Sequence, residues 1–277
     1  MKLADELMAQ LERYAQTCAL PRVCALHLPP VDKAGKNDGE FCALELDDGA
    51  LGLSYLLLDE TLKELLDKDH GGLIGRDPLE IARWFSNPQA SPGKRTLGFA
   101  AVNALSRSLF DRAGFVSEMS SDSLGYLAPA AGDHVGMIGF FPPLIRRVLA
   151  AGANLTVIEL NAELAGDYTD YTVSLNAEDL RHCNKVLSTS TVLLNDTLDR
   201  MLSYCRDADA FAMIGPSAGC LPDALFARGV TFVGGTWIHD SAGFINAIHT
   251  GESWSQFAQK CALRPDSYPG FDALLAK

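Results

Sequence analysis

Short apolar runs recur through the second half of the chain, and nearly all of them end in small or polar residues. The runs span residues 135–139, 155–158, 185–187, 211–214 and 230–233. Segments with a helical pattern, such as residues 144–151, separate them. Continuous apolar strands that alternate with helices are typical of a parallel sheet buried on both faces. We therefore predict the α/β class, with a doubly wound parallel sheet in this half of the chain.

The residues that follow these strands predict a binding site. Ligands of doubly wound sheets bind outside the carboxyl ends of the strands, where the chain turns toward a helix. A helix is predicted over residues 192–205, and one of the hydroxyls of residues 188–191 is expected to cap it. The candidate ligand-binding residues at this edge of the sheet are Gly139, Glu159, Thr189, Thr191, Asn195, Gly215 and Ser217.

The first half of the chain has a different pattern. A helix is predicted over residues 2–19, strands at 23–28, 41–46 and 51–57, and helices at 78–85 and 94–110. This order indicates a smaller α+β domain with an antiparallel meander. The stretch 117–133 lacks periodicity and is interpreted as a linker. We therefore predict two domains, residues 1–128 and 129–277.

Composition excludes several classes of function. The formal net charge is −12 and Lys and Arg form no stripe, so nucleic acid is not an expected partner. The first residues lack the apolar stretch of a signal peptide, and no window reaches the ~18 apolar residues of a membrane span. Seven scattered cysteines are typical of reduced thiols. We expect a cytoplasmic protein that does not bind membranes, and we leave a homo-oligomer open.

The turn after the first strand of the parallel sheet has two interpretations. Residues 136–143 lack the pattern G-x-G-x-x-G that lets a dinucleotide approach the backbone, so we expect no NAD-dependent redox activity. Free N–H groups after Gly139 could still bind an anion, or the segment is an ordinary tight turn. Glu159 follows about twenty residues later, where such folds place a ribose-binding acid. A solvated carboxylate is the alternative for Glu159.

Three further positions carry chemistry that has a structural alternative. Cys220 is either a thiolate at a helix N-terminus or a small packing residue. His239-Asp240 follows a predicted strand and could ligate a metal or form an acid–base pair, if the chain forms a loop there. Asn103 lies in an apolar helix and either ties down a loop or faces a cleft between the domains. The spacing of Cys and His matches no zinc motif.

The order of these motifs resembles a known family. The matching residues are Leu97-Gly98, Ala100-Ala101, Asn103-Ala104, Gly139, Glu159, Thr191, Asn195, Thr197, Gly215-Pro216-Ser217, Gly234-Gly235 and Asp240. They are similar to bacterial and archaeal proteins of unknown function that are grouped as a heavy-metal-chelation family. That family joins an enolase-N-terminal-like domain to a Rossmann-like domain. Ala218-Gly219-Cys220 departs from the Thr or Pro-rich turn that is common in the family, which leaves the role of this loop open.

The resemblance implies a cleft between the two domains that binds a metal, a metal chelate or another small molecule. A divalent or heavy-metal ion is the cofactor that it implies. An enzyme that acts on an anionic or chelating substrate there, a lyase or a transferase, is the alternative. We predict that Glu159, Asn195, Ser217 and Asp240 converge in this cleft and that Asn103 faces them from the first domain.

Overall fold

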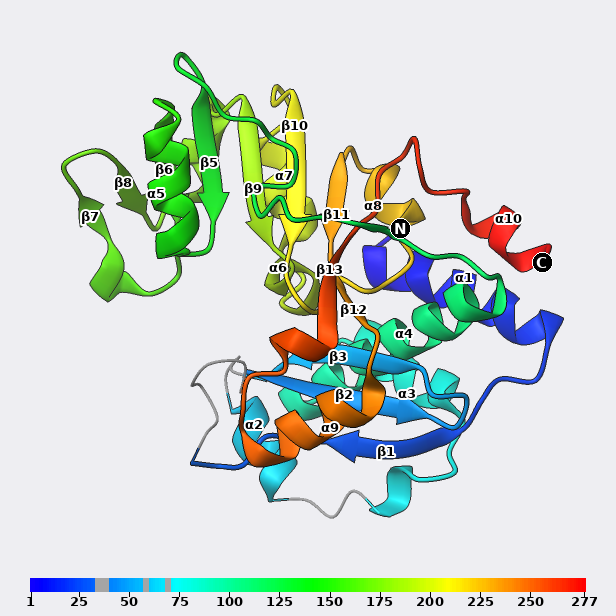
Figure 1. Cartoon of the computed structure of the whole chain (residues 1–277). Coiled ribbons are helices and arrows are strands. Elements are labelled where there is room, and N and C mark those ends of the chain that lie inside the picture. The colour runs from blue at the N-terminus through cyan, green and yellow to red at the C-terminus, as the bar shows by residue number, and fades with distance from the viewer. Residues whose placement is uncertain (33–39, 57–59, 68–70) are drawn as a thin grey trace.

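The computed structural model describes residues 1–32, 40–56, 60–67 and 71–277. A seven-stranded sheet has the strand order β11-β10-β9-β5-β6-β8-β7 (Figure 1). Its strands are β5 (His134–Ile138), β6 (Asn154–Ile158), β7 (Gly166–Asp167), β8 (Thr172–Ser174), β9 (Lys185–Thr189), β10 (Ala210–Ile214) and β11 (Phe232–Gly234). Every neighbouring pair is parallel except β7 with β8. The predicted α/β fold with a parallel sheet is confirmed.

Helices cover both faces of this sheet because its strands are apolar on both sides. On one face, α5 (Pro142–Ala150) packs Ile145 against Val135 and Met137. The other face carries a 3₁₀ turn (Ala177–His182), α6 (Thr191–Leu194), α7 (Leu198–Tyr204) and α8 (Asp223–Phe226). The chain leaves β5 toward β6 and later returns to β9 on the opposite side of β5. The strand order therefore reverses between β5 and β9.

The N-terminal unit is an antiparallel meander packed on helices. Its strands β1 (Val23–His27), β2 (Phe41–Leu46) and β3 (Leu51–Tyr55) pair in chain order. Its helices are α1 (Leu3–Thr17), α2 (Thr61–Leu66), α3 (Pro78–Ser86) and α4 (Pro92–Arg112). The strands and helices predicted for this half are confirmed with small differences at their ends, and residue 57 of the predicted third strand lies outside the described residues.

The chain returns to the N-terminal unit after β11. It forms β12 (Thr236–Ile238), α9 (Ser241–Thr250), β13 (Ala258–Ala262) and α10 (Phe271–Leu275), and β13 pairs with β12 and with β4 (Glu118–Met119). α9 lies against the sheet β1–β3, where Phe244 packs with Ala43 and Leu53 (Figure 1). This helix belongs to the second predicted domain in sequence but packs on the first, and the boundary itself stays a prediction. Among the described residues, no helix combines the length and apolarity that crossing a bilayer requires.

α4 is the central helix of the molecule and is buried along most of its length. At Gly52 of β3, a β-carbon would lie 2.1 Å from the carbonyl oxygen of Ala100. At Gly98, a β-carbon would lie 2.4 Å from the backbone nitrogen of Phe85 in α3. β3 and α3 therefore contact the α4 backbone directly, as the run of small residues in this helix predicts.

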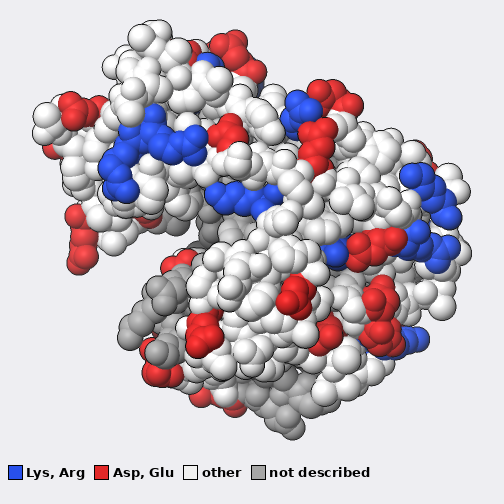
Figure 2. Space-filling model, in the orientation of Figure 1, with Lys and Arg blue, Asp and Glu red and all other residues white. Residues whose placement is uncertain are grey.

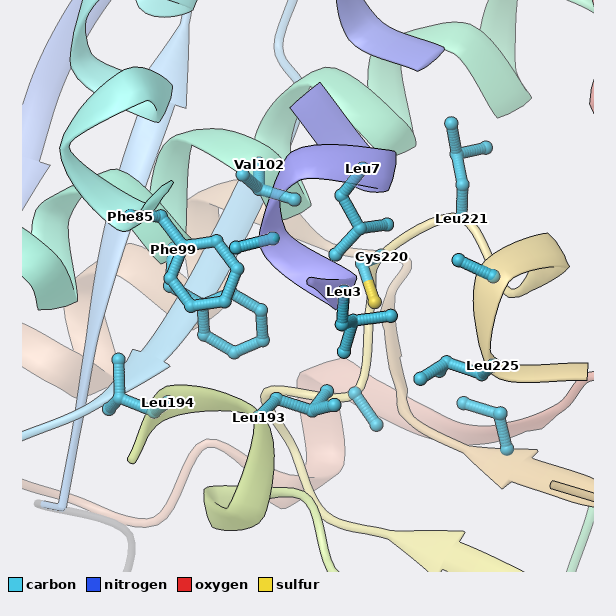
Figure 3. Packing of buried hydrophobic residues seen from close by; sticks show 14 of the residues in the cluster. Leu3, Leu7, Phe85, Phe99, Val102, Leu193, Leu194, Cys220, Leu221 and Leu225 are labelled. Carbon is cyan, nitrogen blue, oxygen red and sulfur yellow. The ribbon is translucent and has the colours of Figure 1, made fainter. Parts of the chain in front are cut away.

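One hydrophobic core joins the N-terminal unit to the parallel-sheet unit. Figure 3 shows residues of both units in this core: Leu3, Leu7, Phe85, Phe99 and Val102 from the first, and Leu193, Leu194, Cys220, Leu221 and Leu225 from the second. Separation of the two units would expose this apolar surface to water, which is unfavourable. The shared core therefore holds the units in one relative position.

Polar side chains of α4 also bind backbone groups of the parallel-sheet unit. Arg95 Nε donates to the Leu194 carbonyl at 2.6 Å, and Arg107 Nη1 donates to the Ile238 carbonyl at 3.1 Å. Asn103 Nδ2 donates to the carbonyls of Leu53 at 2.7 Å and Ser217 at 2.9 Å. Ser106 Oγ accepts from the Leu221 N–H at 3.2 Å. Leu194 ends α6, which follows β9; Ser217 and Leu221 lie in the loop after β10; Ile238 ends β12, and Leu53 lies in β3. α4 thus fixes the loops at the carboxyl edge of the sheet, and Asn103 ties down a loop.

The single helix predicted over residues 192–205 is wrong. The chain forms α6 and α7, and Asp196 between them has φ +59°. A residue at positive φ ends a helix, and Asp tolerates this conformation better than most residues. Apolar spacing continues across the break, so periodicity did not reveal it. Ser190 is the N-cap of α6 and its side chain makes no capping bond, whereas the Thr189 hydroxyl accepts from the N–H of Thr191, the first residue of α6, at 3.2 Å.

Three polar side chains connect α9 to the meander. His27, which is 6% exposed, is hydrogen-bonded through Nε2 to Glu45 Oε2 at 2.8 Å and through Nδ1 to His249 Nε2 at 3.0 Å. Two protonated imidazoles would have no acceptor between them, so one ring must stay neutral for this bond. Burial, and then the charge of His27, lowers the pKa of His249.

Replacement of Asn103 with Ala removes two hydrogen bonds and leaves two carbonyl groups without this donor. We expect urea unfolding to show a loss of about 1–3 kcal/mol. Asn246→Ala, at an exposed position of α9, is the control and should stay within about 0.5 kcal/mol of the wild type. If Asn103→Ala lowers the free energy of unfolding no more than Asn246→Ala does, Asn103 does not bridge the two units.

The lowered pKa of His249 predicts that stability depends on pH. In the unfolded chain His249 has a pKa of about 6.5 and therefore binds a proton more readily than in the folded protein. The contribution of His249 to the free energy of unfolding is full above that pH, and it is lost as the pH falls through the lower pKa of the folded state. Urea midpoints measured from pH 7.5 down to 5 should therefore fall less steeply in His249→Gln than in the wild type. The exposed His239→Gln is the control, and equal slopes in all three proteins would refute the assignment.

Candidate functional site

A cavity of about 900 Å³ opens at the carboxyl edge of the parallel sheet. Its wall takes residues from the ends of β5, β6, β9, β10 and β11 and from β2 and β3 of the N-terminal unit. Figure 2 shows the surface hollowed between the lobe that holds β5–β8 and the lobe that holds β1–β3. The edge that the sequence predicted as a binding site therefore borders a cavity between the two units.

The cavity spans the point where the strand order reverses. Gly139 follows β5, Thr189 ends β9, and both residues line the cavity. Gly139 has φ +99°, and a β-carbon there would lie 2.9 Å from the Phe141 ring and 3.5 Å from the Thr189 β-carbon. Glycine adopts this backbone without strain and leaves the space between the strands open. Ligands of doubly wound sheets bind in the crevice at this point.

The turn after β5 is an apolar wall and a poor anion site. Phe140 and Phe141 line the cavity, half-buried, and α5 begins with Pro142 and Pro143. Proline has no N–H, and the Gly139 N–H donates to the Ile158 carbonyl at 2.9 Å. The donors that a helix N-terminus usually offers to a phosphate are thus mostly removed or occupied. Of the two interpretations for this segment, the structure favours the ordinary turn.

Glu159 lines the cavity at the end of β6, half-buried. Its Oε1 accepts hydrogen bonds from the N–H groups of Leu160 at 2.7 Å and Asn161 at 3.2 Å. These bonds hold the carboxylate against its own backbone turn. They leave Oε2 as the oxygen available to a ligand.

Hydroxyl and amide groups follow β9 along the wall. Thr189 Oγ1 donates to Thr191 Oγ1 at 3.0 Å and accepts from the Thr191 N–H at 3.2 Å. Asn195 Oδ1 accepts from Thr197 Oγ1 at 2.6 Å. These bonds leave the Thr191 hydroxyl proton and the Asn195 amide nitrogen available to a ligand. Thr189, Thr191 and Asn195 all line the cavity.

Three predicted site residues lie outside the wall. Ser217 is 2% exposed, and its Oγ is hydrogen-bonded to Ser190 Oγ at 3.0 Å. Asn103 is 3% exposed and binds the Ser217 carbonyl, so these two residues form a buried layer that supports Gly215 in the wall. Asp240 is exposed, caps α9 by accepting from the Gly243 N–H at 3.0 Å, and does not join the predicted convergence. Helix capping explains its position.

Cys220 is the packing residue of the two alternatives. It is fully buried, burial raises the pKa of its thiol to about 12, and α8 begins three residues later at Asp223. A thiol in this environment stays protonated at neutral pH. It therefore belongs to the shared core and not to the chemistry of the site.

The sequence analysis missed wall residues that come from four other elements. Phe41 and Tyr55 come from β2 and β3, Arg200 from α7 and Lys260 from β13. Burial raises the pKa of Tyr55, and the charges of Glu40 and Glu159 raise it further, so its hydroxyl stays a neutral donor. The only signal for Tyr55 was a polar tip at the end of an apolar strand. Its place beside the parallel sheet depends on contacts between the units.

The described side chains do not fit a bare metal ion. Residues 1–32, 40–56, 60–67 and 71–277 contain no group of three or more His, Cys, Asp or Glu side chains that could hold one. Zinc in proteins takes three or four such ligands, and calcium takes about six to eight oxygens. The described side chains alone would therefore give an ion at this cavity too few ligands.

Two family models match the chain, and both have the description "putative heavy-metal chelation". One matches residues 122–265, more than half of the chain, and the other matches residues 39–106. An uncharacterized protein of Methanocaldococcus jannaschii is 27% identical over 205 residues, which cover 69% of this chain and 77% of that protein. These matches fall in both predicted domains.

Solved structures of the same family share the fold. A protein of unknown function from Desulfitobacterium hafniense is 20% identical, with a TM-score of 0.66 over 92% of this chain and 99% of its own. One from Pyrococcus horikoshii is 17% identical, with a TM-score of 0.66 over 93% and 99%. An enolase-superfamily member from Salmonella typhimurium reaches a TM-score of only 0.28, so the enolase likeness stays a prediction. By its sequence and its fold, the chain belongs to the family described as "putative heavy-metal chelation".

Proposed function

We propose that this protein binds a small molecule in the cavity between its two units. The observation that carries the proposal is the position of the cavity at the reversal of strand order, where Gly139 keeps the crevice open. Its volume of about 900 Å³ lies within the roughly 300–1,000 Å³ of small-molecule pockets. The wall combines apolar side chains with a few polar groups that have no partner among the residues that the structure describes, such as the Asn195 amide nitrogen.

A metal reaches this site as part of a chelate. The described wall residues include Glu40, Asp122, Glu159 and Cys261, yet they form no group of three ligands around one point. An organic chelator would supply the missing ligands, and the cavity would recognise the chelator. This form of binding agrees with the family description and with the side chains of the site.

A catalytic role has weaker support. The described histidines are absent from the wall, and the Cys261 thiol in it has a pKa raised to about 11 by burial. General acid–base chemistry near neutral pH usually needs a group whose pKa lies closer to 7. A lyase or transferase therefore stays the alternative that the sequence left open.

A ligand screen by thermal unfolding tests the proposal. Zinc, nickel and cobalt chlorides, their citrate complexes and a library of small organic molecules would be compared on the wild type and on Asn195→Trp, which fills part of the cavity. We expect at least one organic molecule or complex to stabilise the wild type, by about 2.7 kcal/mol at 100 times its dissociation constant. The variant should lose this shift because its cavity is blocked.

Asn246→Trp on the exposed face of α9 is the matched control and should keep the shift of the wild type. Stabilisation of wild type and Asn195→Trp to the same extent would place the ligand elsewhere. Stoichiometric stabilisation by the bare chlorides alone would contradict the chelate form.

A further inference from the structure

We infer that the ligand of this cavity is a flat, apolar molecule with an anionic group, and that Arg200 binds that group. This inference rests on the proposed function and narrows it to one chemical class. Four observations support it. Arg200 has no partner among the described residues, Lys260 has only a hydroxyl partner there, two carboxylates of the wall accept backbone hydrogen bonds, and aromatic side chains line the wall.

Arg200 is a cation of the wall that has no partner among the described residues. It lines the cavity from α7, and within the described residues its guanidinium makes no hydrogen bond, ion pair or cation–π contact. The chain has 35 acidic and 23 basic residues, so carboxylates are abundant, and Arg228, which follows α8, pairs with both Glu6 and Asp199. A guanidinium presents a planar set of donors that matches a carboxylate, phosphate or sulfonate.

Lys260 is the second cation of the wall. Its Nζ donates to Ser123 Oγ at 2.8 Å, and within the described part of the chain it makes no ion pair with a carboxylate. A hydroxyl partner leaves the charge of an ammonium group uncompensated. Both cations that line the cavity therefore offer positive charge to a ligand.

Two carboxylates of the wall accept hydrogen bonds from backbone N–H groups. Asp122 accepts from the N–H groups of Leu124 and Tyr126, both at 2.9 Å, and pairs with Arg147 at 3.4 Å. Glu159 accepts from two N–H groups of its own turn. Hydrogen bonds and ion pairs of this kind reduce the negative field that such groups present to a ligand. Burial and then the charges of Glu40 and Glu159 raise the pKa of Tyr55, so its hydroxyl stays protonated and able to donate to a ligand.

Aromatic side chains from both units form the apolar part of the wall. Phe41 and Tyr55 form an edge-to-face pair with ring centroids 5.6 Å apart, and Phe140 and Phe141 line the cavity from the turn after β5. Leu160 also belongs to the wall and is 79% exposed. Aromatic rings bind other flat rings by stacking and edge contacts, and an exposed leucine gains from being covered.

Two fluorescent probes that differ mainly in charge test the inference. Anilinonaphthalene sulfonate is aromatic and anionic, and N-phenyl-1-naphthylamine is its neutral counterpart. Titration of the folded protein should show one site for each probe. Arg200→Gln should weaken sulfonate binding at least tenfold and change binding of the neutral probe less than twofold. Arg200→Lys should keep part of the affinity, since it retains the charge and loses the planar donors.

Arg146→Gln is the matched control, because Arg146 is exposed on α5 and lies outside the wall. Circular dichroism and thermal unfolding would verify that each variant is folded. An equal loss of affinity for both probes in Arg200→Gln, or no loss of affinity for either probe, would overturn the inference while leaving the site intact. If instead neither probe binds, or both bind equally to Asn195→Trp, the cavity is not a ligand site and the proposed function fails as well.

Discussion

The hydrogen bonds that α4 makes to carbonyl groups of the parallel-sheet unit are the constraint on which the rest of the structure depends. Asn103 binds one carbonyl of β3 and one of the Gly215-Pro216-Ser217 turn, so a single amide joins the two units. Because these bonds lie inside a shared hydrophobic core, water does not compete for them. The loops at the carboxyl edge therefore have fixed positions before any ligand arrives. A preformed cavity costs less conformational entropy on binding than one that must be assembled.

The turn after β5 shows how a common fold can change its ligand. Nucleotide-binding sheets use glycines and free N–H groups at this position to hold phosphates. Here Phe140-Phe141-Pro142-Pro143 places two rings and two prolines there, so the donors are replaced by an apolar surface. The positive charge of the wall comes instead from side chains of α7 and β13. The site keeps the location that the topology favours and loses the phosphate chemistry that usually accompanies it.

Much of this architecture could be predicted from local sequence patterns. The apolar runs at β5, β6, β9 and β10, and the polar residues after them, located both the parallel sheet and the edge with the cavity. Contacts between distant segments could not be predicted in this way. Asp196 at positive φ interrupts a helix whose apolar spacing continues, α9 packs on a sheet far away in sequence, and Arg200 looks like an ordinary exposed residue. Its place in the wall of the cavity, visible only in three dimensions, distinguishes it.

Hydrogen exchange of the backbone amides tests the central claim, that α4 joins both units into one cooperative body around a preformed cavity. The Leu221 amide is the most direct probe, because it donates to Ser106 of α4 from the loop after β10. The account predicts that this amide and those of α4, β9 and β10 exchange with one free energy, equal to that of global unfolding. Exchange of Leu221 and the parallel sheet through a separate, lower-energy opening, while α4 stays protected, would contradict it.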